Sequence, residues 1–154
     1  MSKANETIYK AEEVAKYFIF LSSRLIGEER EGVTNLKLQK ILYFAQAYFV
    51  AKLNRTLFSD PIEAWNYGPV VGTIYHKYKD NKNQPIILEV DDANISEPDK
   101  VMLSKIWDLF GGYSASRLVD MTHEHKPWKT AFNAKLKEIS IESLRDYYSP
   151  MLNK

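Results

Sequence analysis

The apolar run Ile41-Leu42-Tyr43-Phe44-Ala45-Gln46-Ala47-Tyr48-Phe49-Val50-Ala51 is the strongest structural signal in this chain of 154 residues. Gln46 is its only strongly polar residue, so a helix built from it has almost no face to offer water. Thr34 suits the N-cap of such a helix, which is predicted over residues 35–53. Because this helix needs other helices around it, we expect it at the centre of a bundle.

Further helices are predicted on both sides of this segment. Apolar residues at helical spacing indicate a helix over residues 8–26, with Gly27 at its C-terminal end. Gly68 and Pro69 are expected to begin another helix, whose apolar side includes Val70 and Val71 and which ends near Tyr78. The remaining helices are expected to start at four positions: Ser96, Ser114, Pro127 and Ser140.

Short strands are predicted between the helices. Residues 56–58 and 62–67 alternate partly between apolar and polar side chains, and Ser59-Asp60-Pro61 joins them, so a small β-hairpin is expected there. Residues 86–90 are a candidate for one more strand. The predicted fold is mainly α: a single compact bundle of about six to seven helices around a central apolar helix, with a small β-hairpin or short strands. Residues 1–154 are expected to form one domain, with the C-terminal helix 140–153 packed on it.

The composition limits the classes of function. Apolar residues make up 45% of the chain, enough for one sizeable core, and the formal net charge is only +1. A balanced charge provides no overall attraction to nucleic acid or to a membrane. The chain has no cysteine, which excludes disulfides, thiolate catalysis and Cys-based metal sites. No apolar run is long enough to span a bilayer, so the expected location is the cytoplasm.

Two segments rich in aromatic residues are the candidate functional regions. They are Pro61 to Val71, which contains Glu63-Ala64-Trp65 and Tyr67-Gly68-Pro69, and Thr122 to Trp128. Trp65, Tyr67 and Trp128 are candidate anchors for a partner, because rigid aromatic side chains dominate interface hot spots. The alternative is that they pack against the central helix, since burial is the usual fate of such side chains. A mixed role, with one edge buried and one exposed, would satisfy both interpretations.

The sequence supports catalysis or metal binding less well than it supports binding of a partner. His123 and His125 are two residues apart and would diverge on a helix, and the sequence supplies no spacing for four ligands, so no metal or cofactor is expected. None of the serines lies in a Gly-x-Ser-x-Gly turn, and Ser96 and Ser114 are better explained as helix caps. The chain is therefore not expected to be an enzyme.

A basic strip for nucleic acid remains an open alternative if exposed cations gather beside the aromatic residues. The candidates for such a strip are Lys77, Lys79, Lys82, Arg117, Lys126, Lys129, Lys135 and Lys137.

Three ordered blocks resemble the Panacea antitoxin domain family, which includes SocA-like and phage-associated GepA-like proteins. The first is Leu38-Gln39-Lys40-Ile41-Leu42-Tyr43-Phe44-Ala45-Gln46-Ala47-Tyr48, and the second runs from Pro61 to Tyr78. The third comprises Ser114-Ala115, Thr122-His123 and Pro127-Trp128, so the resemblance spans about residues 10–135.

The resemblance implies an antitoxin of a bacterial or prophage type II toxin–antitoxin system. Such a protein would bind a cognate toxin from a neighbouring gene directly, and in some members it also delivers the toxin to a AAA+ protease. The alternative function is a nucleic-acid-binding regulator of its own operon. The candidate partner-binding residues are Trp65, Tyr67, Gly68, Pro69, Val70, Tyr75, His76, Tyr78, His123, Glu124, Pro127 and Trp128.

Overall fold

The computed structural model describes residues 8–26 and 29–153. These residues form seven α-helices, one 3-10 helix and five short strands. The helices are α1 (Ala11–Ser22), α2 (Asn35–Lys52), α3 (Gly72–Tyr78), η1 (Lys79–Asn81), α4 (Glu97–Phe110), α5 (Ala115–Glu124), α6 (Lys126–Asn133) and α7 (Ile141–Leu152). The strands are β1 (Leu25–Ile26), β2 (Glu29–Arg30), β3 (Ile62–Trp65), β4 (Gly68–Val71) and β5 (Glu138–Ile139).

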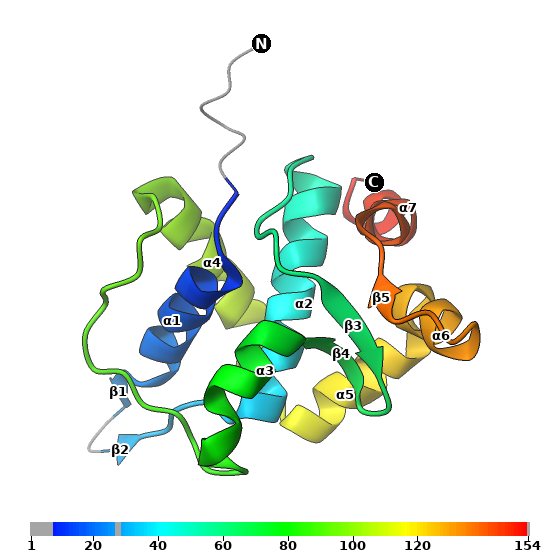
Figure 1. The fold of residues 1–154 in the computed structure, drawn as a ribbon. Helices are drawn as coiled ribbons and strands as arrows, with labels where there is room; N and C mark the ends of the chain where they lie inside the picture. Colours follow the sequence, from blue (N-terminus) through cyan, green and yellow to red (C-terminus); the bar gives the residue numbers. More distant parts are fainter. Residues whose placement is uncertain (1–7, 27–28, 154) are drawn as a thin grey trace.

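Helix α2 lies at the centre of the molecule, and α1, α3, α4, α5 and α7 all pack against it (Figure 1). Fourteen of its 18 residues are buried, so it has no continuous face toward water. The Thr34 side chain accepts a hydrogen bond from the Lys37 backbone N–H and caps the helix. The predicted mainly α bundle around a central apolar helix is confirmed. Within the described ranges, no helix combines the length and the apolar character needed to cross a bilayer.

The predicted caps of the later helices are confirmed. The side chains of Ser96, Ser114 and Ser140 each accept a hydrogen bond from the backbone N–H three residues further on. Pro127 lies in the first turn of α6, where its missing N–H leaves no intrahelical hydrogen bond unmade. These three serines and one proline therefore set where the helices begin.

The first helix is shorter than the predicted range of residues 8–26. It ends at Ser22, where the hydroxyls of Ser22 and Ser23 both donate to the backbone carbonyl of Ile19. Serine side chains that bind a carbonyl in this way compete with continuation of the helix. The next residues instead form β1, which pairs with β2. Gly27, the predicted end of the helix, lies outside the described residues.

A hairpin forms, but it does not join the predicted strands. Residues 56–58 form no strand, apart from an isolated bridge of Phe58 with Tyr9, and residues 62–65 pair instead with residues that follow them in the chain. Strand β3 pairs antiparallel with β4, with Ile62 opposite Val71 and Trp65 opposite Gly68. Residues 68–71 were expected to begin a helix, and that prediction is wrong, because α3 begins only at Gly72. Asn66 and Tyr67 form the turn, and Gly68 follows it with a φ of 103°, which a glycine adopts without strain.

A third strand, which the sequence analysis missed, completes a small sheet in the order β4-β3-β5. The Ala64 N–H donates to the carbonyl of Lys137, and Ile62 lies opposite Ile139. Residues 86–90 do not form the expected strand; only Ile86 makes an isolated bridge, with Val33. The sheet lies beside α2, with α3 on one side and α6 on the other (Figure 1).

Candidate functional site

The polar residues of α2 hold the β3–β4 hairpin in place. Gln39 Oε1 accepts the Val71 N–H at 2.9 Å, and Gln39 Nε2 donates to Asn35 Oδ1 at 2.8 Å. Asn35 in turn donates from Nδ2 to the carbonyl of Tyr75 at 3.0 Å. Because Val71 and Tyr75 lie on either side of the β4–α3 junction, these two side chains fix the angle between strand and helix.

Lys40 is a fully buried lysine that points at the same strand. Its Nζ donates to the Pro69 carbonyl at 3.0 Å, and its side chain is 0% exposed. Burial lowers the pKa of Lys40 to about 7. No carboxylate lies within ion-pair distance of Nζ among the described residues, so Lys40 serves this backbone carbonyl of β4 rather than a salt bridge.

Gln46 fastens the segment that leads into the hairpin. Its Oε1 accepts the Leu57 N–H and its Nε2 donates to the Phe58 carbonyl, both at 2.8 Å. Roles for Gln39, Lys40 and Gln46 were not predicted from the sequence. Their signal was present, since each is a polar residue on a helix that is otherwise buried in apolar surroundings, where a polar group needs a hydrogen-bond partner.

The second aromatic segment, Thr122 to Trp128, packs against the hairpin and holds its backbone through a hydrogen bond. Trp128 Nε1 donates to the Trp65 carbonyl at 2.8 Å, and Trp128 is only 8% exposed. Its ring is stacked between His123, at 4.1 Å between centroids, and Phe132, at 4.7 Å. The fold therefore brings the two segments together, and Trp128 is a buried support of the hairpin rather than an exposed anchor.

Four aromatic side chains of the hairpin and α3 form a group that we call the aromatic platform: Trp65 on β3, Tyr67 at the turn, and Tyr75 and His76 on α3. The Trp65 ring meets the Tyr75 ring edge-on at 5.0 Å and lies 6.2 Å from His76. Trp65 Nε1 donates to Glu63 Oε1 at 3.0 Å, which fixes the orientation of the indole. Tyr67 stands at the turn and is 70% exposed.

The twelve candidate partner-binding residues fall into three groups by exposure. Tyr67, His76 and Glu124 are exposed; Trp65, Tyr75, Tyr78 and His123 are half-buried; Gly68, Pro69, Val70, Pro127 and Trp128 are buried. A molecule approaching this face would meet the first two groups, whereas the buried group shapes and supports the hairpin. Burial raises the pKa of the Tyr78 hydroxyl, which keeps this side chain neutral.

The comparison with known families covers this same region. The family described as "Antitoxin SocA-like, Panacea domain" matches residues 38–129. The chain belongs to this family. The matched residues run from α2 to α6 and include the aromatic platform, the hairpin and its supports on α2 and α6.

A curated relative of the Panacea domain is Antitoxin SocA of Caulobacter vibrioides (strain NA1000 / CB15N). It is 31% identical over 114 residues, which cover 66% of this chain and 61% of SocA. The chain thus spans less than two thirds of the length of that relative. No solved structure matches. Helices α1 and α7 flank the matched Panacea region in the sequence, and both pack against α2.

The histidines of this Panacea domain do not converge. His125 Nδ1 lies 2.7 Å from the Tyr148 hydroxyl, which lies 2.9 Å from the Tyr43 hydroxyl, and burial lowers the pKa of His125. His123 Nε2 is buried without a hydrogen-bond partner in the described part of the chain, and its ring stacks on Trp128. In that same part no three His, Asp or Glu side chains are grouped as metal ligands would be.

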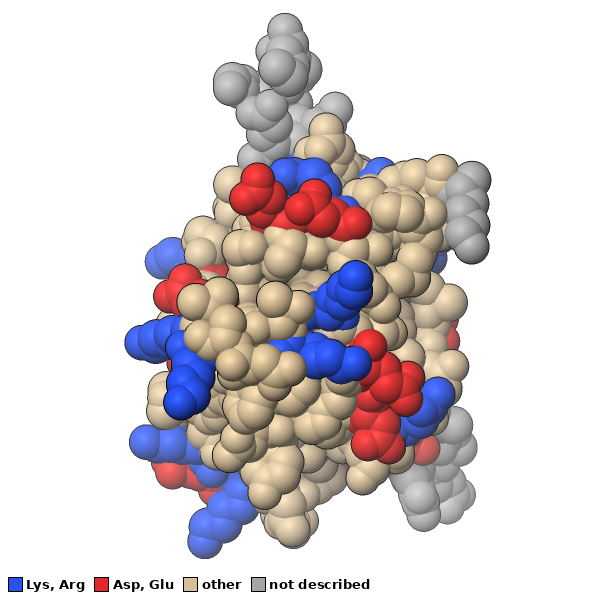
Figure 2. Space-filling model, turned by 90° about the vertical axis from the view of Figure 1, so that its right-hand side faces the viewer, with Lys and Arg blue, Asp and Glu red and all other residues tan. Residues whose placement is uncertain are grey.

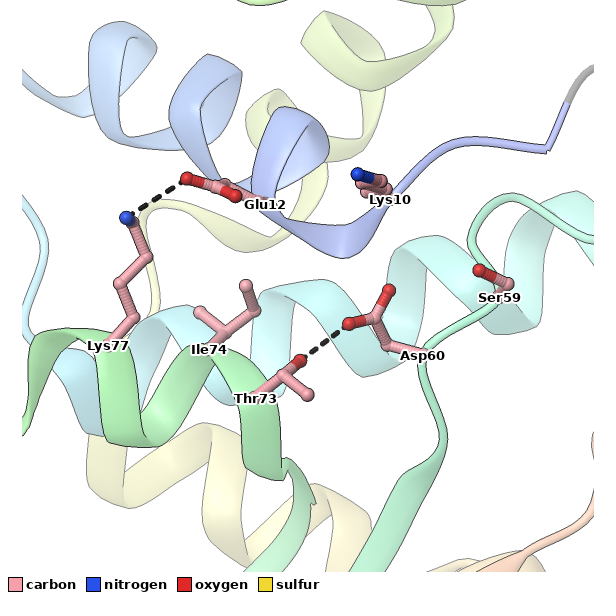
Figure 3. Close-up of a pocket in the computed structure, with 7 residues that line it drawn as sticks. All are labelled: Lys10, Glu12, Ser59, Asp60, Thr73, Ile74 and Lys77. Atoms are coloured by element: carbon pink, nitrogen blue, oxygen red, sulfur yellow. Dashed lines mark hydrogen bonds and ion pairs between the residues drawn. The ribbon is translucent and has the colours of Figure 1, made fainter.

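A polar groove of about 400 Å³ lies between α1 and α3, with Ile74 on its wall (Figure 3). Asp60 joins the two helices there: its Oδ1 accepts the Ala11 N–H at 2.9 Å and its Oδ2 accepts the Thr73 hydroxyl at 2.6 Å. Across the groove Lys77 pairs with Glu12 at 2.9 Å and lowers the pKa of its carboxyl. These hydrogen bonds and this ion pair connect α3 to α1. They therefore also help to hold the part of the aromatic platform that lies on α3.

Proposed function

We propose that this protein is an antitoxin that neutralises a cognate toxin by direct, stoichiometric binding, with the aromatic platform as the centre of the contact. The toxin is expected to be encoded by a neighbouring gene, and the complex to form in the cytoplasm. Membership of the Panacea family and the similarity to Antitoxin SocA support the antitoxin role. The observation that supports the contact region most directly is Tyr67, which is 70% exposed on a hairpin held from three sides.

The geometry of the platform favours binding of another protein. Tyr and Trp side chains provide large contact areas with few rotatable bonds, and they are frequent among interface hot spots. Gln39, Lys40 and Trp128 hold the hairpin backbone before any partner arrives. A surface ordered in advance loses little conformational entropy on association. An interface of about 800 Å² per partner would extend from the platform onto α3 and α6.

On this proposal the protein has no catalytic turnover. The polar groups beside the platform are engaged in holding the fold: Glu63 binds the Trp65 indole, and Lys40 binds a strand carbonyl. One antitoxin would therefore inactivate one bound toxin by covering its functional surface. Growth rescue would then depend on the ratio of the two proteins.

The test is co-expression with the product of the neighbouring gene. We expect the neighbour alone to arrest growth, and this chain to restore growth and to purify with the neighbour as a complex. Tyr67→Ala should weaken the complex by about 1–3 kcal/mol, the range of an interface hot spot, without changing the thermal unfolding of the antitoxin.

Val90→Ala is the matched control, because Val90 is 73% exposed and belongs to the segment between η1 and α4, much of which runs along the side of the molecule away from the hairpin (Figure 1). It should bind the neighbour as the unaltered chain does. Absence of any complex with the neighbour would contradict the antitoxin proposal. Equal affinities of the Tyr67 and Val90 variants would contradict the choice of surface only.

Two modes of neutralisation can be distinguished in cells that express the neighbouring gene with and without this chain. An antitoxin that only covers its toxin leaves the toxin's half-life unchanged or longer. An antitoxin that also delivers the toxin to a AAA+ protease shortens the half-life, and deletion of that protease restores toxicity in the presence of the antitoxin. Measuring toxin decay after translation is stopped distinguishes the two.

A further inference from the structure

Lysines flank the aromatic platform on two sides. Of the 21 lysines and arginines in the chain, seven lie in residues 62–82 and 124–138, which cover the hairpin, α3, η1, α6 and the link to β5. Four of the 20 acidic residues lie in the same two segments: Glu63, Asp80, Glu124 and Glu138. The whole chain has a net charge of +1, so its positive charge is concentrated around the platform.

Most of the flanking lysines are exposed and unpaired. Six of them make no ion pair among the described residues: Lys79, Lys82, Lys126, Lys129, Lys135 and Lys137. Lys77, the seventh flanking lysine, pairs with Glu12. Exposed cations that the fold itself does not neutralise remain available to a partner's carboxylates.

Figure 2 shows the same distribution on the surface. It is turned so that the face seen in Figure 1, with the hairpin and α3, lies along its left margin. Blue groups outnumber red ones along that margin, with uncharged surface between them. This agrees with the excess of lysines over carboxylates in the segments around the platform.

The few carboxylates near the platform favour a polypeptide over a nucleic acid. Glu63 binds the Trp65 indole, and Asp80, Glu124 and Glu138 are exposed in the segments that carry the lysines. A phosphate backbone carries one negative charge per nucleotide and would meet these carboxylates repeatedly. A folded protein can present acidic side chains opposite the lysines and uncharged ones opposite the carboxylates.

We propose that the partner of this face is an acidic protein surface, in which an apolar centre covers Tyr67 and Trp65 and Asp or Glu side chains pair with the lysines on both sides. This inference rests on the proposed function, because it states which surface of the cognate toxin is bound. Lys79 and Lys82 contact the toxin on one side of the platform, and Lys135 and Lys137 contact it on the other.

The experiment measures binding of the co-purified neighbour-encoded toxin to charge-reversed antitoxins. Two variants, Lys79→Glu with Lys82→Glu and Lys135→Glu with Lys137→Glu, test the two sides. Lys52→Glu with Lys105→Glu is the control, because it changes the net charge equally at exposed positions on α2 and α4. Thermal unfolding of each variant shows that the fold is kept.

At low salt, each reversal beside the platform should weaken toxin binding by about tenfold, mainly through slower association, and the difference should shrink as salt is added. At about 0.1 M salt, where the Debye length is about 10 Å, the control should change the affinity by less than about twofold, since exposed charges farther than this from the interface are largely screened.

Unchanged toxin binding by both platform variants would overturn this inference while leaving the antitoxin function in place. If the unaltered chain forms no complex with the toxin, the proposed function fails first, and this inference fails with it. A titration with duplex DNA from upstream of the gene supplies the remaining outcome. Tight binding of that duplex, lost in the platform variants while toxin binding is kept, would show that the lysines contact phosphates and would also overturn the inference.

Discussion

At the scale of single residues, the buried polar side chains of α2 are the least expected feature of the molecule. Lys40 is the clearest case, because its ammonium group is fully buried and, within the part of the chain that the structure describes, has the Pro69 carbonyl as its one partner. Burial of a charge without a counter-ion destabilises the charged form, which is why the pKa of Lys40 falls to about 7. The stability of the protein should therefore depend on pH.

The pKa of Lys40 is lowered in the folded state relative to the unfolded state, where it stays near its ordinary value of 10.5. Between about pH 7 and 10 the unfolded chain thus binds more protons at this site, so stability increases with pH, by at most about 1.4 kcal/mol per unit. Below pH 7 this contribution no longer changes. Urea denaturation at several pH values between 7.5 and 9.5 measures the slope, and this range stays below the titration of Tyr43 and Tyr148, whose pKa values burial raises.

Lys40→Met should remove most of that slope, because the variant keeps the volume of the side chain and loses the titrating amine. Burial also lowers the pKa of Lys37, so a smaller slope of the same sign should remain. Lys52→Met, at an exposed position on the same helix, should keep the slope of the unaltered chain. A Lys40→Met variant whose stability rises with pH as steeply as the unaltered protein would show that Lys40 is not the group responsible.

At the scale of structural elements, the hairpin depends on one glycine. Gly68 has a φ of 103°, and a Cβ there would lie 2.8 Å from Thr122 Oγ1 and 2.9 Å from Lys40 Cε. Gly68→Ala should therefore destabilise the protein by about 1–3 kcal/mol through backbone strain, with the displacement of buried neighbours adding to this.

Gly112→Ala is the matched control for the hairpin, because its Cβ would meet no atom within 4 Å. It should change the free energy of unfolding by less than about 0.5 kcal/mol. Urea denaturation followed by tryptophan fluorescence measures both variants, since Trp65 and Trp128 report on the hairpin directly. Equal stabilities of the two variants would contradict the close packing of Gly68 between α2 and α5.

At the scale of the whole molecule, the fold joins the Panacea region to a helix outside it. The Tyr148 hydroxyl on α7 lies within hydrogen-bond distance of both Tyr43 on α2 and His125 at the start of α6. Tyr148→Phe removes that hydroxyl and leaves two buried or half-buried polar groups without their partner. The expected loss is about 1–3 kcal/mol of unfolding free energy.

Tyr147→Phe tests whether this loss is specific to the shared hydroxyl. Tyr147 is half-buried beside Tyr148 and contacts the His125 ring, but its own hydroxyl makes no hydrogen bond to another described residue. This variant should be within about 0.5 kcal/mol of the unaltered chain. If both variants lose the same stability, the hydrogen-bonded chain of Tyr43, Tyr148 and His125 does not couple α7 to the bundle.

Local sequence signals were sufficient to predict most of the helices and to recognise the family. The apolar run after Lys40 requires burial whatever surrounds it, and Ser96, Ser114 and Ser140 satisfy helix N-termini that lie within three residues of them. Both depend on contacts along the chain, so a reading of the sequence could predict them. The three blocks that resemble the Panacea domain were recognisable for the same reason, since their residue types and spacing lie in the sequence itself.

Contacts between distant residues decided the rest. Residues 68–71 have a proline and a glycine that fit the start of a helix, yet they form a strand because β3 and the side chains of Gln39 and Lys40 take up their backbone hydrogen bonds. The exposure of Tyr67 and the burial of Trp128 likewise follow from where α6 packs, about sixty residues along the chain. The amino-acid sequence by itself determined the central helix, the later caps and the family, because short-range hydrogen bonds and the hydrophobic effect act on local patterns. Only the tertiary structure decided which aromatic residues face solvent, because burial depends on side chains that the linear order keeps far apart.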